Sequence, residues 1–298
     1  LTCRAKTGGE IYVDPSNLSR IYVRDALSGS QPIIYNNFSN GGTLPAVEMI
    51  KGRYHFLAMN GLGQRETVLE NVDLQSSTTL DVPFPMVNFS VTLTKNGMPF
   101  PTLDQQYRGN LIVKIRNIGK EVKKNTVGNG INTFAFQMFP AAVDIVFEGY
   151  LNNGSSSYQR ETLISNKQIA GGETIEIDLE TVSVSGAVKI NGVNPPSSTE
   201  DRGEVWLINS VKKDRFPFWP LGSSGAVGFS REIIVGNYQV AFAGPGISGN
   251  NYLWKSTEIL GLDDDESGMS IDIPRYELSG EITAGGETLP DHLFLDRG

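Results

Sequence analysis

The feature that most constrains this chain is an internal repeat. A turn dipeptide follows the first expected strand of each copy, and its second residue recurs at spacings of 88, 95 and 94 residues. The four copies are Gly8-Gly9, Asn96-Gly97, Asn191-Gly192 and Gly285-Gly286. Asn-Gly and Gly-Gly supply the positive φ angles that tight hairpin turns need, so this position has a mechanical reason to recur. Since solenoid repeats are only about 20–45 residues long, we expect each unit to have its own core.

Two further markers keep the same phase as the turns, which makes a chance match a poor explanation. One marker covers Gly52–Asn60, Gly236–Gly244 and, more loosely, Ala141–Gly149. The other covers Leu80–Pro83, Ile177–Glu180 and Ile271–Pro274. Together the markers predict units at residues 1–86, 87–181 and 182–275, with the start of a fourth, truncated unit at 276–298.

Each unit reads as a series of short strands. Apolar and polar residues alternate, and clusters of Gly, Asn, Ser and Pro punctuate the chain about every ten residues, the spacing of sandwich strands. No stretch repeats apolar residues at helical spacing over three turns. We therefore predict an all-β fold, a tandem array of two-sheet β-sandwiches of about seven strands and about 95 residues each. The expected core residues include Tyr54, Phe56, Tyr238, Val240 and Trp206.

The junctions between units contain very few residues. The sequences "LDVPFPMVNFSV", "IDLETVSVSGAV" and "IDIPRYELSGEI" pass almost directly from the last strand of one unit to the first strand of the next. A Gly/Ser linker would behave as a flexible coil, and these segments are not of that kind. We expect rod-like stacking with restricted hinge motion.

Composition excludes several classes of protein. The net charge of −8 argues against a nucleic-acid partner, because phosphate binding needs a basic face. No segment approaches the roughly 18 apolar residues of a transmembrane helix. The single cysteine, Cys3, excludes an intrachain disulfide framework, and we expect a buried or stray strand thiol there rather than a lipid-anchored residue. Composition and repetition together indicate an exported protein, extracellular or at the cell surface.

The pattern "VSGAVKINGVNPP…RGEVWLIN…GNYQVAFAGPG…SIDIP" carries a resemblance to a known family. It resembles tandem repeats in secreted and surface proteins of myxobacteria and related bacteria, units that are similar to carboxypeptidase-regulatory-like domains. The resemblance implies immunoglobulin-like or transthyretin-like sandwiches that are exported and non-catalytic, and it supplies no catalytic residues. The second unit departs most from the pattern, since Ala142-Val143-Asp144 stands where the others have Gly-x-Tyr.

Catalytic chemistry has few candidate residues. A Ser-His-Asp or Cys-His arrangement would have to use His55 or His292, the only histidines. Neither lies in ligand spacing with Cys3, so a zinc site is not indicated. Asp81, Asp178 and Asp272 recur once per unit, too sparsely for a paired-carboxylate site, and we expect them to face solvent and limit edge pairing. The protein is therefore expected not to be an enzyme.

Calcium is the one cofactor that the sequence suggests. The segment Leu262–Ser267 places Asp263, Asp264, Asp265 and Glu266 in a row, and calcium prefers six to eight oxygen ligands. The alternating positions and central glycine of an EF-hand loop are missing. A solvated acidic loop is the alternative interpretation.

Carbohydrate is the candidate ligand of the segment Arg215–Gly222. Phe216, Phe218 and Trp219 stand beside prolines there, and exposed aromatic rings can stack on sugar rings. The alternative is that the same rings pack in the core or between units.

The sequence thus favours a structural or adhesive protein, part of a longer surface array or fibre, whose partners are neighbouring repeats or subunits of the same protein. The alternatives are a carbohydrate-binding surface protein and a non-catalytic spacer attached to an enzyme. Two strands of the truncated unit cannot be stable alone, so we expect them to be covered by a continuing chain or by strand addition from another subunit. The residues expected to pack there are Leu278, Ile282, Leu293 and Leu295.

Overall fold

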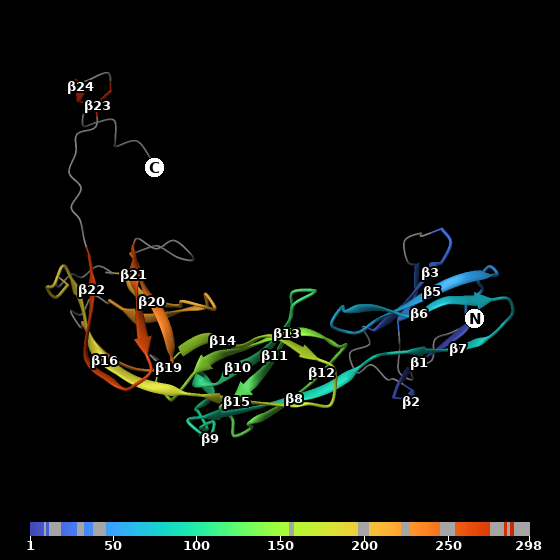
Figure 1. The fold of residues 1–298 in the computed structure, drawn as a ribbon, viewed down its shortest axis with the longest axis horizontal. Coiled ribbons are helices and arrows are strands. Elements are labelled where there is room, and N and C mark those ends of the chain that lie inside the picture. Colours follow the sequence, from blue (N-terminus) through green and yellow to red (C-terminus); the bar gives the residue numbers. More distant parts are fainter. Residues whose placement is uncertain are drawn as a thin grey trace.

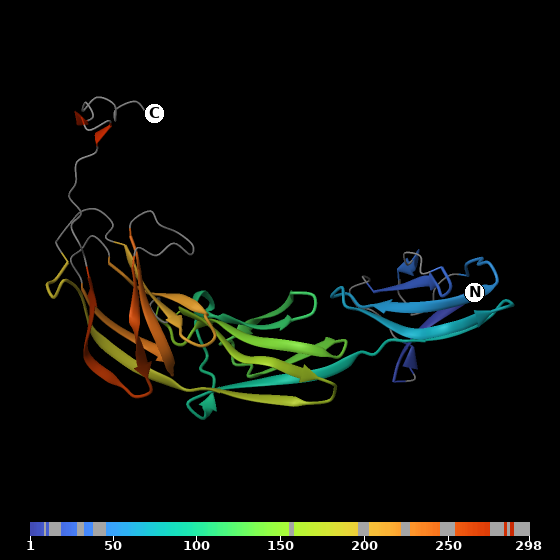
Figure 2. The ribbon, with the colours of Figure 1, turned by 45° about the horizontal axis from the view of Figure 1, so that its top comes forward.

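The computed structural model describes residues 1–8, 10–11, 19–28, 33–37, 46–154, 158–195, 203–221, 227–244, 254–274, 283–284 and 287–288. Almost all of the regular structure in these residues is strand, with one short 3₁₀ turn at Gln105–Tyr107. The strands form three successive β-sandwiches that follow one another along the chain (Figures 1 and 2). The prediction of an all-β tandem array of sandwiches is confirmed.

The second and third sandwiches have the same topology. In the second, the sheets are β12-β8-β15, with β9 beside β8, and β11-β10-β13-β14; in the third they are β19-β16-β22 and β18-β17-β20-β21. The strands of the second are β8 (Val87–Lys95), β9 (Met98–Pro99), β10 (Gly109–Ile115), β11 (Lys120–Val127), β12 (Thr133–Met138), β13 (Ala141–Tyr150), β14 (Tyr158–Ile169) and β15 (Thr174–Leu179). The strands of the third are β16 (Thr181–Ile190), β17 (Glu204–Asn209), β18 (Arg215–Pro220), β19 (Gly228–Ile234), β20 (Gly236–Ala243), β21 (Trp254–Leu262) and β22 (Glu266–Ile273).

The first sandwich follows the same plan in its described residues, with sheets β2-β1-β7 and β4-β3-β5-β6. Its strands are β1 (Thr2–Thr7), β2 (Glu10–Ile11), β3 (Arg20–Asp25), β4 (Ile33–Asn37), β5 (Gly52–Met59), β6 (Arg65–Leu74) and β7 (Thr79–Pro83). Beyond the third sandwich the structure describes one hairpin, β23 (Thr283–Ala284) with β24 (Glu287–Thr288). Leu278, Ile282, Leu293 and Leu295 lie outside the described residues, so their packing stays a prediction.

The first and last strands of each sandwich pair in parallel. β1 pairs with β7, β8 with β15, and β16 with β22, whereas the other pairings are antiparallel. Parallel strands enter at the same end of the sheet, so each sandwich receives the chain at one end and releases it at the opposite end. We call these the entry end and the exit end. The expected unit limits at 86/87 and 181/182 stay a proposal.

Alternation along the strands builds the cores. In β12 every second residue is buried, which places Phe134, Phe136 and Met138 against the facing sheet. Of the expected core residues, Phe56, Tyr238 and Val240 are buried, and Tyr54 packs partly against the core. The prediction that Trp206 lies in the core is wrong. Its neighbours Val205 and Leu207 belong to the core, and the indole lies on the opposite face of the sheet with Arg215 over its ring.

The recurring aspartates have a turn-forming role. Asp178 accepts hydrogen bonds from the Gly97 N–H and the Thr94 hydroxyl, and Asp272 accepts one from the Gly192 N–H. In both sandwiches the last strand thus caps the tight turn that follows the first strand. Asp81 instead pairs with Arg4 and Lys6.

Candidate functional site

The junctions between sandwiches carry the most specific arrangement in the described residues. Only Phe84, Pro85 and Met86 separate β7 from β8, and only Glu180 separates β15 from β16. Two sandwiches joined this closely must bring the exit end of one against the entry end of the next. We call the contacts between the first and second sandwiches the first junction, and those between the second and third the second junction.

A buried glutamine holds the first junction. The Phe139 N–H donates to Gln64 Oε1 at 2.9 Å, and Gln64 Nε2 donates to the Phe139 carbonyl at 3.1 Å. Gln64 lies just before β6 in the first sandwich, whereas Phe139 lies between β12 and β13 in the second. Asn60 orients the amide, because its Nδ2 donates to the same Oε1 at 2.7 Å. Gln64 therefore pairs both backbone groups of Phe139, which the adjoining strands leave free.

A second buried glutamine holds the second junction in the same way. The Ile234 N–H donates to Gln159 Oε1 at 3.1 Å, and Gln159 Nε2 donates to the Glu232 carbonyl at 3.0 Å. Gln159 lies at the start of β14 in the second sandwich, and its partners lie at the end of β19 in the third. The two junctions thus share one device, a glutamine side chain on the exit end that pairs backbone groups on the next entry end.

The residue that receives each glutamine also inserts into the preceding core. Phe139, 2% exposed, belongs to the core of the first sandwich and meets Phe84 edge-on with ring centroids 6.0 Å apart. Ile234, 7% exposed, belongs to the core of the second sandwich. Each lies two residues before the first residue of the following strand, β13 or β20. We call this the anchor position; because of it, each core continues across its junction.

The second junction adds a buried carboxylate. Glu161 on β14 accepts a hydrogen bond at 2.7 Å from Nδ2 of Asn209, the last residue of β17, and lies 3.3 Å from Nζ of Lys212, in the turn between β17 and β18. Its other oxygen, Oε2, has no hydrogen-bond partner among the described residues. Burial raises the pKa of Glu161 to about 7, with Asp214 adding to the rise and Lys212 opposing it. Asp214 crosses the same junction by accepting the Thr162 N–H at 2.6 Å.

A second charged group spans the same junction at Glu232 on β19. Lys95 Nζ lies 2.6 Å from Glu232 Oε1, and Asn152 Nδ2 donates to Oε2 at 2.9 Å. Both partners belong to the second sandwich. The hydroxyl of Thr181, the first residue of β16, donates to Oε1 at 2.7 Å, so the strand that follows the linker joins the group.

Arg231 on β19 is a buried cation at the same place. Its guanidinium donates to the carbonyls of Pro217 and Phe218, and across the junction to the carbonyl of Tyr158. Burial lowers the pKa of Arg231 to about 10. It lies over the rings of Phe216 and Phe218, at 5.3 and 5.5 Å from their centroids.

Sequence reasoning missed these junction residues, although a signal was present. The tetrapeptide Gln-Arg-Glu-Thr occurs at 64–67 and again at 159–162, a spacing of 95 residues that matches the repeat. Identity at four polar positions in strands that otherwise diverge indicates a shared contact rather than shared packing. The corresponding strand of the third sandwich, β21, has no such tetrapeptide.

The structure places the proposed carbohydrate-binding rings mainly inside. Phe216 and Phe218 are 0% and 1% exposed and belong to the core of the third sandwich, while Trp219 is half-buried and packs against it. The two phenylalanines therefore offer no ring face to a sugar. They pack in the core, which is the alternative interpretation of this segment. Trp219 alone retains an accessible part.

The acidic row is exposed at the entry end of the third sandwich, with three aspartates between β21 and β22 and Glu266 as the first residue of β22. Asp265 accepts a hydrogen bond from the Ser183 N–H at 2.7 Å, which gives it a local structural role. Within the described part of the chain, no group of three or more His, Cys, Asp or Glu side chains is arranged to hold a metal ion. Calcium binding by Asp263, Asp264, Asp265 and Glu266 stays a prediction.

The remaining residues that were considered for catalysis, metal binding or anchoring do not lie together in the described structure. The Asn71 N–H points at His55 Nδ1 at 3.4 Å, and His292 lies outside the described residues. Cys3 is buried in the core of the first sandwich, as expected. In the part of the chain that the structure covers, no helix has the length and hydrophobicity of a membrane span.

Comparison with known proteins gives similarity at the level of solved structures only. No protein-family model and no curated protein sequence matches the chain. The chain is similar to the Bacillus anthracis TIE protein, with 13% identity and a TM-score of 0.24 over 92% of this chain and 50% of that one. The chain therefore spans half the length of that protein.

Two pilins are also similar in structure. GBS52, the minor pilin of Streptococcus agalactiae, aligns with 66% of this chain and 100% of its own, at 10% identity and a TM-score of 0.30. BcpA, the major pilin subunit of Bacillus cereus, aligns with 90% and 98%, at 9% identity and a TM-score of 0.20. The resemblance to carboxypeptidase-regulatory-like repeats stays a prediction, and we base the function on the junctions.

Proposed function

We propose that this chain is a stiff, non-catalytic segment of an extracellular structural or adhesive array, in which sandwiches are held end to end by their junctions. The observation that carries the proposal is the repeated glutamine contact, Gln64 on Phe139 and Gln159 on Ile234. A flexible string of domains needs no such buried, directional contact between neighbours. A rod that bears load or projects from a surface does.

The physical basis of stiffness is that bending would break several contacts together. Opening a junction removes Phe139 or Ile234 from the preceding core and leaves two backbone groups and an amide without partners. Each intramolecular hydrogen bond that is exchanged for bonds to water costs a net of about 0.5–1.5 kcal/mol, so bending is opposed even before the lost apolar contact is counted. Linkers of three residues and one residue leave little chain to absorb rotation.

Small-angle X-ray scattering of the 298-residue protein tests this function directly. The expected result is one narrow distribution of maximum dimension that matches the arrangement in Figure 1. The double variant Gln64→Ala/Gln159→Ala should broaden that distribution, while the exposed control Glu66→Gln should not. A broad distribution for the unmodified protein would overturn the stiff-segment proposal, and immunogold labelling confined to the cytoplasm would overturn the surface role.

A further inference from the structure

In the first sandwich, the residue at the anchor position does not pack into any core formed by the described residues. Ile50 lies two residues before β5, the same offset that Phe139 has from β13 and Ile234 from β20. Its side chain is 85% exposed, whereas those of the other two are 2% and 7% exposed. Phe139 and Ile234 are each buried by the preceding sandwich, so the exposed Ile50 lies at the position that a preceding sandwich covers in the other two units.

Two contacts show that Ile50 and Ile234 occupy equivalent positions. The Tyr54 hydroxyl donates to the Ile50 carbonyl at 2.7 Å, and the Tyr238 hydroxyl donates to the Ile234 carbonyl at 2.7 Å. The neighbouring turn matches as well. Asp25 accepts two backbone N–H groups in the first sandwich, and Asn209 accepts the corresponding two in the third.

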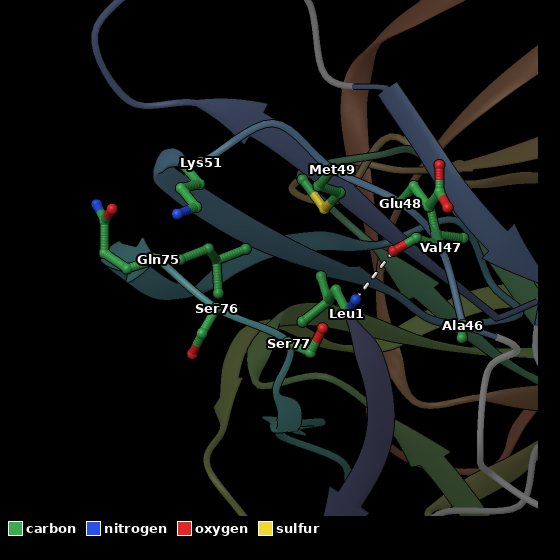
Figure 3. Close-up of a pocket in the computed structure, with 10 residues that line it drawn as sticks. Leu1, Ala46, Val47, Glu48, Met49, Lys51, Gln75, Ser76 and Ser77 are labelled. Carbon is green, nitrogen blue, oxygen red and sulfur yellow. Dashed lines mark hydrogen bonds between the residues drawn. The ribbon is translucent and has the colours of Figure 1, made fainter.

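A hollowed, partly apolar surface lies beside Ile50, and the neighbouring residues Met49 and Lys51 line it. A depression of about 610 Å³ lies at the entry end, and Figure 3 shows Leu1, Val47 and Met49 along it. Leu1 and Val47 exchange two backbone hydrogen bonds of 2.9 Å, which hold these two lining residues of the depression together. The Ile50 N–H has no hydrogen-bond partner among the described residues, although the equivalent N–H groups of Phe139 and Ile234 each bind a glutamine.

We propose that this entry end binds the exit end of one more β-sandwich of the same kind, which precedes Leu1 in the full-length polypeptide and inserts a glutamine between the Ile50 N–H and the Glu48 carbonyl. This inference rests on the proposed array function, and it names the partner of the entry end of the first sandwich. Ile50 would enter that sandwich's core, as Phe139 and Ile234 enter theirs.

A second copy of this chain is the less suitable occupant. The exit ends of the first and second sandwiches already bind Phe139 and Ile234 within the chain. The third sandwich begins its corresponding strand β21 at Trp254-Lys255-Ser256 and lacks the Gln-Arg-Glu-Thr tetrapeptide. The described residues therefore hold no free exit end with the required glutamine.

Hydrogen exchange of the Ile50 amide tests the proposal, measured in the full-length native protein and in the 298-residue chain. Since exchange from a buried hydrogen bond requires the junction to open, we expect roughly 100-fold slower exchange in the full-length protein. The Phe139 and Ile234 amides should exchange at equal rates in both proteins. In the full-length protein, Ile50→Asp should restore fast exchange to the amides of residues 48–51.

The matched control is Ile259→Asp, on an isoleucine of β21 that is 52% exposed, and it should leave those amides protected. Equal Ile50 exchange in the two proteins overturns the proposal. So does a full-length protein with no sandwich before Leu1, or protection in the 298-residue chain that grows with its concentration, which would identify a second copy. The scattering experiment is independent, because three sandwiches can form a stiff rod whether or not Ile50 is covered.

Discussion

The two junctions use the same glutamine contact and differ in nearly everything around it. At the first junction the anchor is an aromatic ring, and the Phe139 ring meets the Phe84 ring within the core of the first sandwich. At the second the anchor is the smaller Ile234, and the same junction also contains the charged groups of Glu161, Glu232 and Arg231. One junction is therefore stabilised mainly by apolar burial and the other mainly by buried polar contacts.

One part of this difference lies in a pair of residues that are equivalent in the repeat. Glu66 and Glu161 hold the same place in the repeated tetrapeptide, yet Glu66 is exposed and Glu161 is buried. Glu161 is covered by the end of β17 and by the turn that follows it, because Asn209 and Lys212 contact its carboxylate and Asp214 accepts the Thr162 N–H. The second junction should therefore respond to pH and salt, whereas the first should not.

The largest expected effect is at the first junction. Phe139→Ala removes a buried ring from the core of the first sandwich and should lower the free energy of unfolding by about 3–5 kcal/mol. Ile234→Ala should cost less, about 2–4 kcal/mol, because fewer buried carbons are lost. Urea denaturation would measure each loss of free energy, and hydrogen exchange would show at which junction it occurs. Equal losses of free energy in the two variants would contradict the larger contribution of the buried ring at the first junction.

The next effect is the pH response of the second junction. Burial raises the pKa of Glu161 from 4.5 to about 7, so the native state holds this proton more tightly than the unfolded chain does. The free energy of unfolding should therefore fall as pH rises from about 4.5 to 7, by a total on the order of 3 kcal/mol. Thermal unfolding at pH 5 and pH 8 measures the difference.

Glu161→Gln stays uncharged and should flatten that pH profile, while Glu66→Gln at the first junction should leave it unchanged. A profile that keeps its slope in Glu161→Gln would show that another group is responsible.

The glutamines should have intermediate and similar effects. Gln64→Ala and Gln159→Ala each leave two backbone groups unpaired and should cost about 1–3 kcal/mol. Each variant should accelerate amide exchange only at its own junction, at Phe139 or at Ile234. Acceleration at both junctions in either variant would mean that the sandwiches unfold as one unit.

The smallest effect concerns Lys95 and Glu232. Their side chains are 14% and 17% exposed, and the atoms lie 2.6 Å apart. Lys95→Met should cost about 1 kcal/mol, since Asn152 and Thr181 remain on the carboxylate. Denaturation at low salt and in 1 M salt measures how salt affects the pair. The difference in free energy of unfolding between the variant and the unmodified protein should be smaller in 1 M salt.

The sandwich array could be predicted from local signals, but the junctions could not. Asn96-Gly97 and Asn191-Gly192 mark turns through their own backbone preferences, and both asparagines have positive φ. Gln64 and Phe139 are separated by 75 residues, and the contact uses the backbone of Phe139, which any residue supplies. Only the recurrence of Gln-Arg-Glu-Thr pointed to it.

The sequence by itself determined the all-β class, the repeat and the short linkers, because turn residues and alternation act over a few neighbouring positions. Only the tertiary structure decided which face of "EVWLIN" is inside, why Phe216 and Phe218 are buried, and which anchors are covered. Alternation allows either face of a strand to be the core, and the choice depends on the sheet packed against it. The exposure of Ile50 is the clearest case, since its sequence position resembles those of Phe139 and Ile234 and only its surroundings differ.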